Sequence, residues 1–248
     1  MHQEDMSIIE KSRITGNVLI INQTDEEKEL SGKTEHGTAR MICTRERGLS
    51  RSRNMALRHT KGDICLLCDD DEVFLPGYEE TILKAFDRYP EADVIAFNLT
   101  NRKPRLRQKP QKIGYLRSLR LASYHLAFRR DRILQSGLRF DERMGAGTGN
   151  GGGEENKFLL DCLREKLRIR YEPEVVAEMR EGSSTWFFGF DEAFFYQRGA
   201  STRYMMGFWP AAVYGLYYIL AKCPRYRSTI SPWRAGSALF RGMKDDPL

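Results

Sequence analysis

Cysteine is scarce in this chain, and the few cysteines form no recognisable framework. Five cysteines in 248 residues are an odd number without disulfide-framework spacing, which favours a reducing compartment. Cys65 and Cys68 have the CxxC spacing, but residues three apart on a strand point to opposite faces, so this pair cannot hold one metal. We expect both thiols to lie in the core.

Long apolar runs are also missing. Met1–Lys11 has no apolar core of the length that a signal peptide needs. The uncharged run Tyr204–Ala221 has eighteen residues, the lower limit for a membrane span, and it contains Gly207, Pro210 and Gly215. Its aromatic side chains and flanking basic residues are typical of a helix lying in a membrane interface. A terminal helix pair packed against the domain is the alternative.

Acids are absent from one long segment of the chain. Between Arg102 and Arg120 there are eight Lys or Arg and no Asp or Glu. This segment is either a solvated loop or a basic arm that meets phosphate or anionic lipid. Its single aromatic residue, Tyr115, argues against base stacking and therefore against a nucleic-acid partner. The formal net charge of +6 likewise favours anionic partners.

Apolar residues are frequent enough for a packed α/β domain. They make up 41% of the sequence, and its length suits one sizeable domain with a tail. We expect a domain over residues 1–200 and a helical tail over residues 201–248. The apolar patterns predict strands at residues 17–22, 39–43, 64–68, 92–99 and 123–128, and helices at residues 49–58, 78–89 and 154–166.

The stretch Gly48–Glu72 organises the rest of the chain. It consists of an amphipathic helix, a Lys61-Gly62-Asp63 turn, the apolar run Ile64–Cys68, and then four acids. The run has the length of a strand that is covered on both faces. Acids that follow such a strand are either a solvated turn or the ligands of a divalent cation, which binds hard carboxylate oxygens.

A second acidic block follows about eighty residues later. Phe140-Asp141-Glu142 precedes the glycine-rich stretch Gly145–Gly153, and Gly153-Glu154-Glu155-Asn156 then begins a helical pattern. Six glycines in the stretch predict a flexible loop that allows close approach of a ligand. The loop lacks the features of a phosphate-binding loop. Acids at a helix start also suit the helix dipole, which explains one of them more readily than two.

Together the two blocks resemble family 2 glycosyltransferases of the GT-A fold, of the bacterial surface-polysaccharide type. GLSRSRNMAL, GD, an apolar strand and DDD resemble the donor half, while the second block resembles the acceptor-side acidic motif. The resemblance covers residues 17–185. It implies a mixed, Rossmann-like central sheet flanked by helices, and inverting transfer of a sugar from a nucleotide-diphospho-sugar to a hydroxyl.

The resemblance also implies roles for particular residues. Asp69 and Asp71 would hold Mg²⁺ or Mn²⁺, which neutralises the departing diphosphate. Glu155, or failing that Glu154, would be the general base. The remaining residues are expected to bind substrate: Asp70 at the ribose or sugar, Asn22 and Asp25 at and after the end of the first apolar strand, and Gly153 in the glycine loop. Arg51 and Arg53 are expected either to contact phosphate or to form salt bridges on the helix surface.

The sequence departs from the family pattern at two places. Residues 1–16 offer no convincing first strand, and without one a central position in the sheet would be empty. Near the metal, where many members have a His, this chain has Glu178, either a surface residue or a further ligand. Two rival functions are a nucleotidyltransferase, although its N-terminal phosphate loop is missing, and an inactive GT-A-like binding module.

The expected setting follows from the same resemblance. The partners are a nucleotide-sugar donor and a glycan or lipid-linked acceptor. We expect a cytoplasmic protein in surface polysaccharide or lipid-linked glycan assembly, with peripheral contact at the inner face of the membrane through the tail.

Overall fold

The computed structural model describes residues 3–100, 106–121, 125–145, 148, 152–180 and 189–245. The chain forms two compact units. We call them the sheet unit (Met1–Asp141 with Glu154–Gly182) and the helical unit (Glu142–Gly153 with Ser183–Leu248). These units describe compactness and not which segments fold independently, so the predicted domain boundary at residue 200 stays a prediction.

The larger sheet is built around a strand that is buried along its whole length. All six residues of β6 (Val94–Leu99) are buried, as the apolar run there predicts. β6 pairs antiparallel with β8 (Leu126–Arg129) and parallel with β9 (Ile169–Met179). Three further strands complete this mixed sheet: β4 (Ile64–Leu66) beside β8, and β5 (Glu72–Phe74) and β7 (Gln111–Ile113) beside β9.

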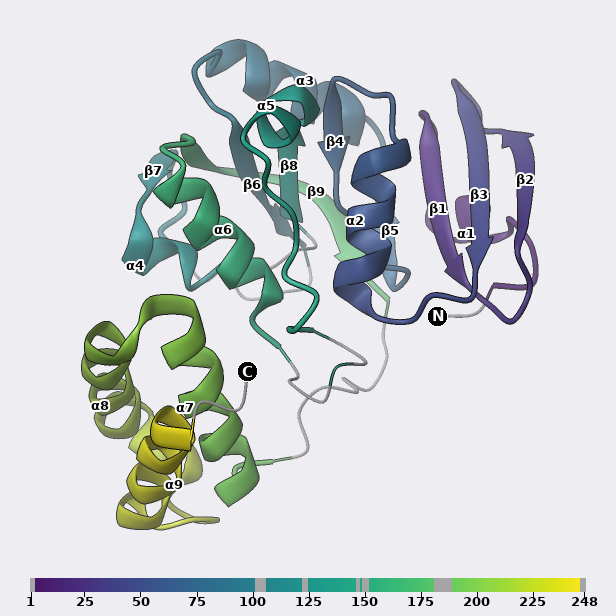
Figure 1. Ribbon diagram of the computed structural model, residues 1–248. Helices are drawn as coiled ribbons and strands as arrows, with labels where there is room; N and C mark the ends of the chain where they lie inside the picture. Colours follow the sequence, from purple (N-terminus) through teal and green to yellow (C-terminus); the bar gives the residue numbers. More distant parts are fainter. Residues whose placement is uncertain are drawn as a thin grey trace. The chain divides into compact units, whose positions relative to one another are not determined.

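Apolar clusters lie on both faces of this sheet, and the alternation of side chains along β6 separates them. Val94 and Ala96 pack in a cluster with Phe158, whereas Ile95 and Phe97 pack in another cluster with Phe86. Helices cover the two faces (Figure 1). They are α2 (Leu49–His59), α5 (Arg130–Gln135) and α6 (Glu154–Arg164) with the first cluster, and α3 (Tyr78–Arg88) with the second.

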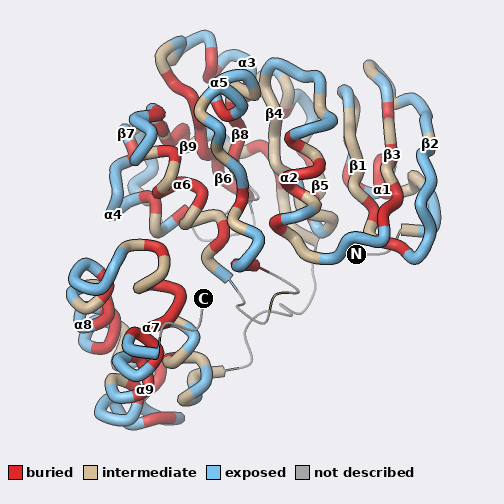
Figure 2. The backbone as a smooth tube through the Cα atoms, viewed as in Figure 1, coloured by how far each residue is buried: buried red, intermediate tan, exposed pale blue. Residues whose placement is uncertain are grey.

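A second, three-stranded sheet lies in the same unit. β1 (Val18–Gln23) pairs parallel with β3 (Thr38–Thr44), which pairs antiparallel with β2 (Lys28–Lys33). The sequence did not predict β2, because KELSGK has no apolar alternation and is exposed almost throughout (Figure 2). Residues 3–16 contain the short helix α1 (Ile8–Lys11) and no strand, and the remaining short helix of the unit is α4 (Tyr115–Ser118).

The strands therefore form two separate sheets. In each sheet one terminal strand, β1 or β4, has an edge without a pairing strand among the described residues. Among the described residues, β1 pairs only with β3, and β4 pairs only with β8. Both strands are apolar in sequence, yet five of the six residues of β1 and all three of β4 are only half-buried. The mixed α/β class agrees with the prediction.

Two details of the sequence prediction were wrong. The strand predicted over residues 64–68 ends at Leu66. Cys68 therefore lies beyond the strand and is exposed, so it is not a core thiol. Coverage of the strand on both faces agrees with the prediction, because half-buried Cys65 packs against one apolar cluster and Ile64 and Leu66 pack against the other. On α3, Leu83 is 53% exposed, because Ile82 and Phe86 fill the inward face.

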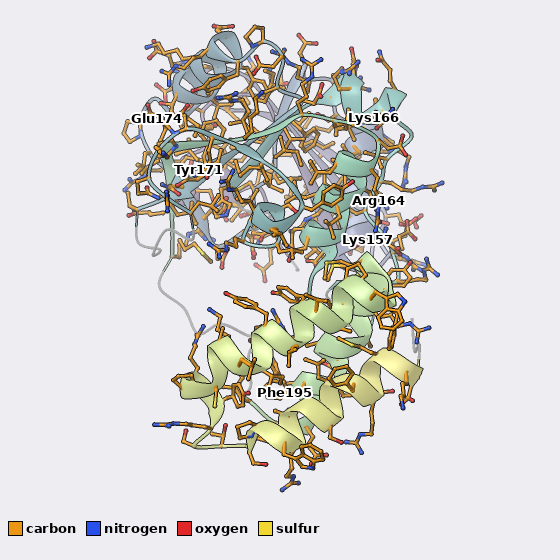
Figure 3. The ribbon with its side chains drawn as sticks, turned by 90° about the vertical axis from the view of Figure 1, so that its left-hand side faces the viewer. Lys157, Arg164, Lys166, Tyr171, Glu174 and Phe195 are labelled. Carbon is orange, nitrogen blue, oxygen red and sulfur yellow. The ribbon has the colours of Figure 1, made fainter. Side chains whose placement is uncertain are left out.

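The described part of the helical unit contains three helices around an aromatic core. They are α7 (Glu192–Met206), α8 (Phe208–Tyr226) and α9 (Pro232–Asp245). Asp191 caps α7 by accepting a hydrogen bond from the backbone N–H of Phe194 at 2.7 Å. Phe195 is fully buried among the three helices, with its ring centroid 4.9 Å from that of Tyr226 (Figure 3).

The predicted uncharged run does not form one helix. Gly207, the fourth residue of the run, has φ of +81° and separates α7 from α8. None of the helices that the structure describes combines the length and the hydropathy of a membrane span.

Close packing in this unit depends on two glycines at the contact between α7 and α9. A Cβ atom on Gly199 would overlap the backbone carbonyl oxygen of Leu239, and one on Gly242 would overlap that of Tyr196. Because backbone atoms cannot rotate away, the helices approach this closely only while both positions lack a side chain.

Gly199→Ala should therefore destabilise the protein by about 1–3 kcal/mol through overpacking. Gly236→Ala is the matched control on α9, because nothing lies within 4 Å of its added Cβ. It should be neutral or stabilising by up to about 1 kcal/mol. Urea unfolding of both variants checks this, and a similar shift for both would contradict the packing argument.

Candidate active site

The site is organised by α2, which is fixed at its start to the end of β1. The side chain of Gln23 accepts a hydrogen bond from the backbone N–H of Gly48 at 3.1 Å and donates one to Ser52 Oγ at 2.6 Å. Gly48 has φ of +118°, which places the turn into the helix in a region that favours glycine. The first turns of α2 are thereby held against the smaller sheet.

Arg53 on α2 is buried and contacts three carboxylates. Its guanidinium lies 3.2 Å from Asp69, 3.5 Å from Glu154 and 3.3 Å from Glu155, with only 6% of the residue exposed. Its Cζ also lies 5.4 Å from the ring centroid of Phe140. One cation therefore joins the acids after β4 to the acids at the start of α6, two groups that are far apart in sequence.

The neighbouring residue on α2 fixes the second acidic block. The Asn54 amide donates to the backbone carbonyl of Phe140 at 2.9 Å and accepts from its backbone N–H at 2.8 Å. Asn54 is buried, so these bonds satisfy polar groups that have no access to water. The two bonds fix the register between α2 and the Phe140-Asp141-Glu142 block.

The acids Asp69–Asp71 lie in the loop between β4 and β5. Arg180, just after β9, holds the backbone of this loop, because its N–H donates to the carbonyl of Asp71 at 2.6 Å and its guanidinium donates to that of Asp70 at 3.1 Å. Burial raises the pKa of Asp69 above its ordinary value, and the Arg53 guanidinium opposes this shift. Burial also raises the pKa of Asp70.

Glu72 is the acid of this cluster to which the sequence interpretation gave no role. It is fully buried, and neither of its carboxylate oxygens has a hydrogen-bond partner among the described residues. Burial, and then the nearby Asp69, raise the pKa of Glu72 well above its ordinary value. The only sequence signal was its position directly after three aspartates, which does not distinguish a buried acid from an exposed one.

The two glutamates at the start of α6 differ in exposure. The side chain of Glu154 is 4% exposed and that of Glu155 is 17% exposed. Burial, followed by the charge of Glu155, raises the pKa of Glu154 to about 8. The Arg53 guanidinium beside Glu154 opposes this shift.

These residues suit a divalent cation in their chemistry. Asp69, Asp71 and the partnerless oxygens of Glu72 are hard oxygen donors. Within the described ranges, no three Asp, Glu, His or Cys side chains are close enough together to hold a metal by themselves. Mg²⁺ commonly uses only one or two carboxylates and takes its other ligands from phosphates and water, so the donor set fits such an ion.

Two other predicted substrate-binding residues, Asn22 and Asp25, have contacts outside the Arg53 network. The buried Asn22 amide donates to the backbone carbonyl of Gln3 at 2.7 Å and accepts from its N–H at 2.9 Å. Asp25 is fully exposed and pairs with Arg47 at 2.6 Å. Arg51 is exposed on α2, and Gly153 has φ of +103°.

Parts of two predicted loops lie outside the described residues. They are residues 146, 147 and 149–151 of the glycine-rich stretch, and residues 101–105 of the basic segment. His125, expected to be packed, has a buried Nδ1 atom. Glu178 lies half-buried on β9, opposite Val73 of β5.

Comparison with known proteins identifies the family. The family model described as glycosyl transferase family 2 matches residues 22–147, which is half of the chain and includes α2, Arg53 and the three aspartates. The chain belongs to glycosyl transferase family 2. No curated protein matches the sequence.

Solved structures of glycosyltransferases share this fold. Staphylococcus aureus TarS 1–349 in complex with UDP-GlcNAc has a TM-score of 0.58 at 12% identity, over 86% of this chain and 65% of that one. A mannosyltransferase from Pyrobaculum calidifontis in complex with GDP-Man and Mn²⁺ has a TM-score of 0.55 at 13% identity, over 99% of this chain and 84% of that one. The chain thus spans slightly less than two thirds of the first of these structures. At these identities the likeness establishes the GT-A fold alone.

Arg53→Gln should lower the free energy of unfolding by about 3–5 kcal/mol, because it leaves buried carboxylates without their cation. Arg51→Gln on the same helix is the control. Its side chain is exposed, so the change should stay within about 0.5 kcal/mol. Urea unfolding at pH 7 with chelator present makes the comparison. Equal stability of the two variants would show that the Arg53 network contributes nothing to the fold.

Proposed function

We propose that this protein is an inverting glycosyltransferase that moves a sugar from a nucleotide-diphospho-sugar to an acceptor hydroxyl. Membership of the family supports glycosyl transfer, and the UDP-GlcNAc and GDP-Man bound to the two similar structures support the class of donor. The observation that carries the proposal is the Arg53 network, in which acids of both motifs contact one buried guanidinium.

On the donor side, Asp69 and Asp71 would hold Mg²⁺ or Mn²⁺. When bound, such an ion neutralises the charge that develops on the departing diphosphate. The loop backbone is held by Arg180, so the carboxylates of Asp69 and Asp71 extend from a fixed support. Asp70 would orient the ribose or the sugar, and Arg51 would meet phosphate from the exposed side of α2.

On the acceptor side, we assign the general base to Glu155. Burial and the charge of its neighbour raise the pKa of Glu154, so this carboxyl group holds its proton more readily than an ordinary glutamate does. Glu155 is the more exposed of the two, so its carboxylate would take the proton of the acceptor hydroxyl.

The acceptor that we propose is a growing surface polysaccharide or a lipid-linked glycan, used at the inner face of the cell membrane. The support is the class of family that the motifs resemble, together with the apolar and basic surface of the helical unit. At the inner face of the membrane, a lipid-linked acceptor hydroxyl would meet a nucleotide-sugar that is supplied from the cytoplasm.

Asp71→Ala should abolish metal-dependent binding of the donor. UDP-GlcNAc and GDP-Man are tested separately, and one of them should raise the midpoint of thermal unfolding of the unaltered protein when Mn²⁺ is present. The same nucleotide-sugar should not raise the midpoint of Asp71→Ala, nor that of the unaltered protein when chelator replaces Mn²⁺. Asp87→Ala, an exposed acid on α3, is the control and should respond like the unaltered protein. An unchanged Mn²⁺-dependent response of Asp71→Ala would remove this residue from the metal site.

Glu155→Gln should reduce transfer by at least about a hundredfold, because a general base supplies about 10²–10⁴-fold of rate. The substitution keeps the size of the side chain, so donor binding and the midpoint of unfolding should change little. Transfer is measured by release of nucleoside diphosphate in the presence of acceptor. Glu154→Gln should have the smaller effect. The reverse ranking would move the base to Glu154, and near-normal transfer by the double variant would exclude this motif from the chemistry.

A further inference from the structure

One face of α8 is apolar and open to solvent. Trp209, Val213, Leu216 and Leu220 are 78%, 72%, 55% and 67% exposed. Their spacing of four, three and four residues puts them on one side of a helix. In the helical unit they form a continuous exposed row, which we call the α8 face. In Figure 2 exposed segments alternate with buried ones along this helix.

The packing of α8 within its own unit does not need this row. The opposite side of the helix supplies the core contacts, since Ala211, Tyr218 and Ile219 are buried in the apolar cluster with α7 and α9. Gly215 on that side lets Leu239 of α9 pack closely against the helix. A helix of a soluble bundle needs one apolar side, and α8 has two.

The charges near the row are of one sign. α8 contains no Asp or Glu, and Arg225 and Arg227 are exposed at its C-terminal end. Neither arginine makes an ion pair with any residue that the structure describes, whereas Glu192, the acid at the start of α7, already pairs with Arg234 and Arg241. The α8 face therefore ends in uncompensated positive charge.

We propose that the α8 face binds the surface of an anionic membrane, with the helix lying in the headgroup region. The apolar row would enter the boundary between headgroups and acyl chains, where the amphipathic ring of Trp209 is favoured. The two arginines would lie close to the lipid phosphates, where each basic residue contributes to binding. The proposal does not depend on the transfer reaction that we propose for the sheet unit.

Co-sedimentation of the full chain with vesicles tests the proposal. The unaltered protein should bind vesicles of phosphatidylcholine with one quarter phosphatidylglycerol and bind pure phosphatidylcholine at least tenfold more weakly. Leu220→Glu should weaken binding to the anionic vesicles at least tenfold. Leu83→Glu places the same change on an exposed position of α3, and it should bind like the unaltered protein. Replacing Arg225 with Gln should cost about fivefold.

Three results would overturn the proposal. They are no binding of the unaltered protein to anionic vesicles, an equal loss for Leu220→Glu and Leu83→Glu, and a protein that sediments as a dimer without lipid and becomes a monomer on Leu220→Glu. The last result would make the α8 face a contact between two copies of the chain. The thermal unfolding midpoint of each variant is measured first, and Val213→Glu replaces Leu220→Glu if the latter unfolds.

Discussion

A single buried guanidinium balances the charge of the site. Arg53 loses most of its hydration on α2, a loss that would be costly without charged partners at hydrogen-bonding distance. It has three such partners, and those partners would repel one another without it. The fold contributes the remaining support, because Gln23 fixes the start of α2 and Asn54 fixes the backbone of Phe140. The contacts of Gln23 and Asn54 thus fix the part of α2 that carries Arg53.

This arrangement couples the two halves of the site. Asp69 accepts a hydrogen bond from the same guanidinium that lies beside Glu154 and Glu155. A cation bound at Asp69 would share that carboxylate with Arg53, so the charge on the donor side would be felt by the acids on the acceptor side. Glu72 adds to the effect, since its partnerless carboxyl group lies buried close to Asp69.

The sequence predicted those features that depend on local patterns. The apolar run at β6, the amphipathic pattern of α3 and the acids at the start of α6 were all recognisable, and the family model confirms the predicted family over residues 22–147, which include the first motif. Features that depend on distant contacts were not predictable. Arg53 is one of several arginines around α2, and nothing in its neighbours distinguishes the buried one from exposed Arg51. Strand β2 exists because β3 offers it a partner, not because its own residues favour a strand.

The open edges of β1 and β4 have a consequence for how the sheet unit fluctuates. In a parallel pair, alternate backbone amides of a strand point away from the partner, so about half of the N–H groups of β1 face an edge without a pairing strand among the described residues. β6, by contrast, is paired on both sides and wholly buried. Local opening should therefore begin at these two edges, while β6 at the centre of the large sheet stays closed. β1 includes Gln23, which anchors the start of α2. Local opening of the β1 edge is therefore linked to the order of the Arg53 network.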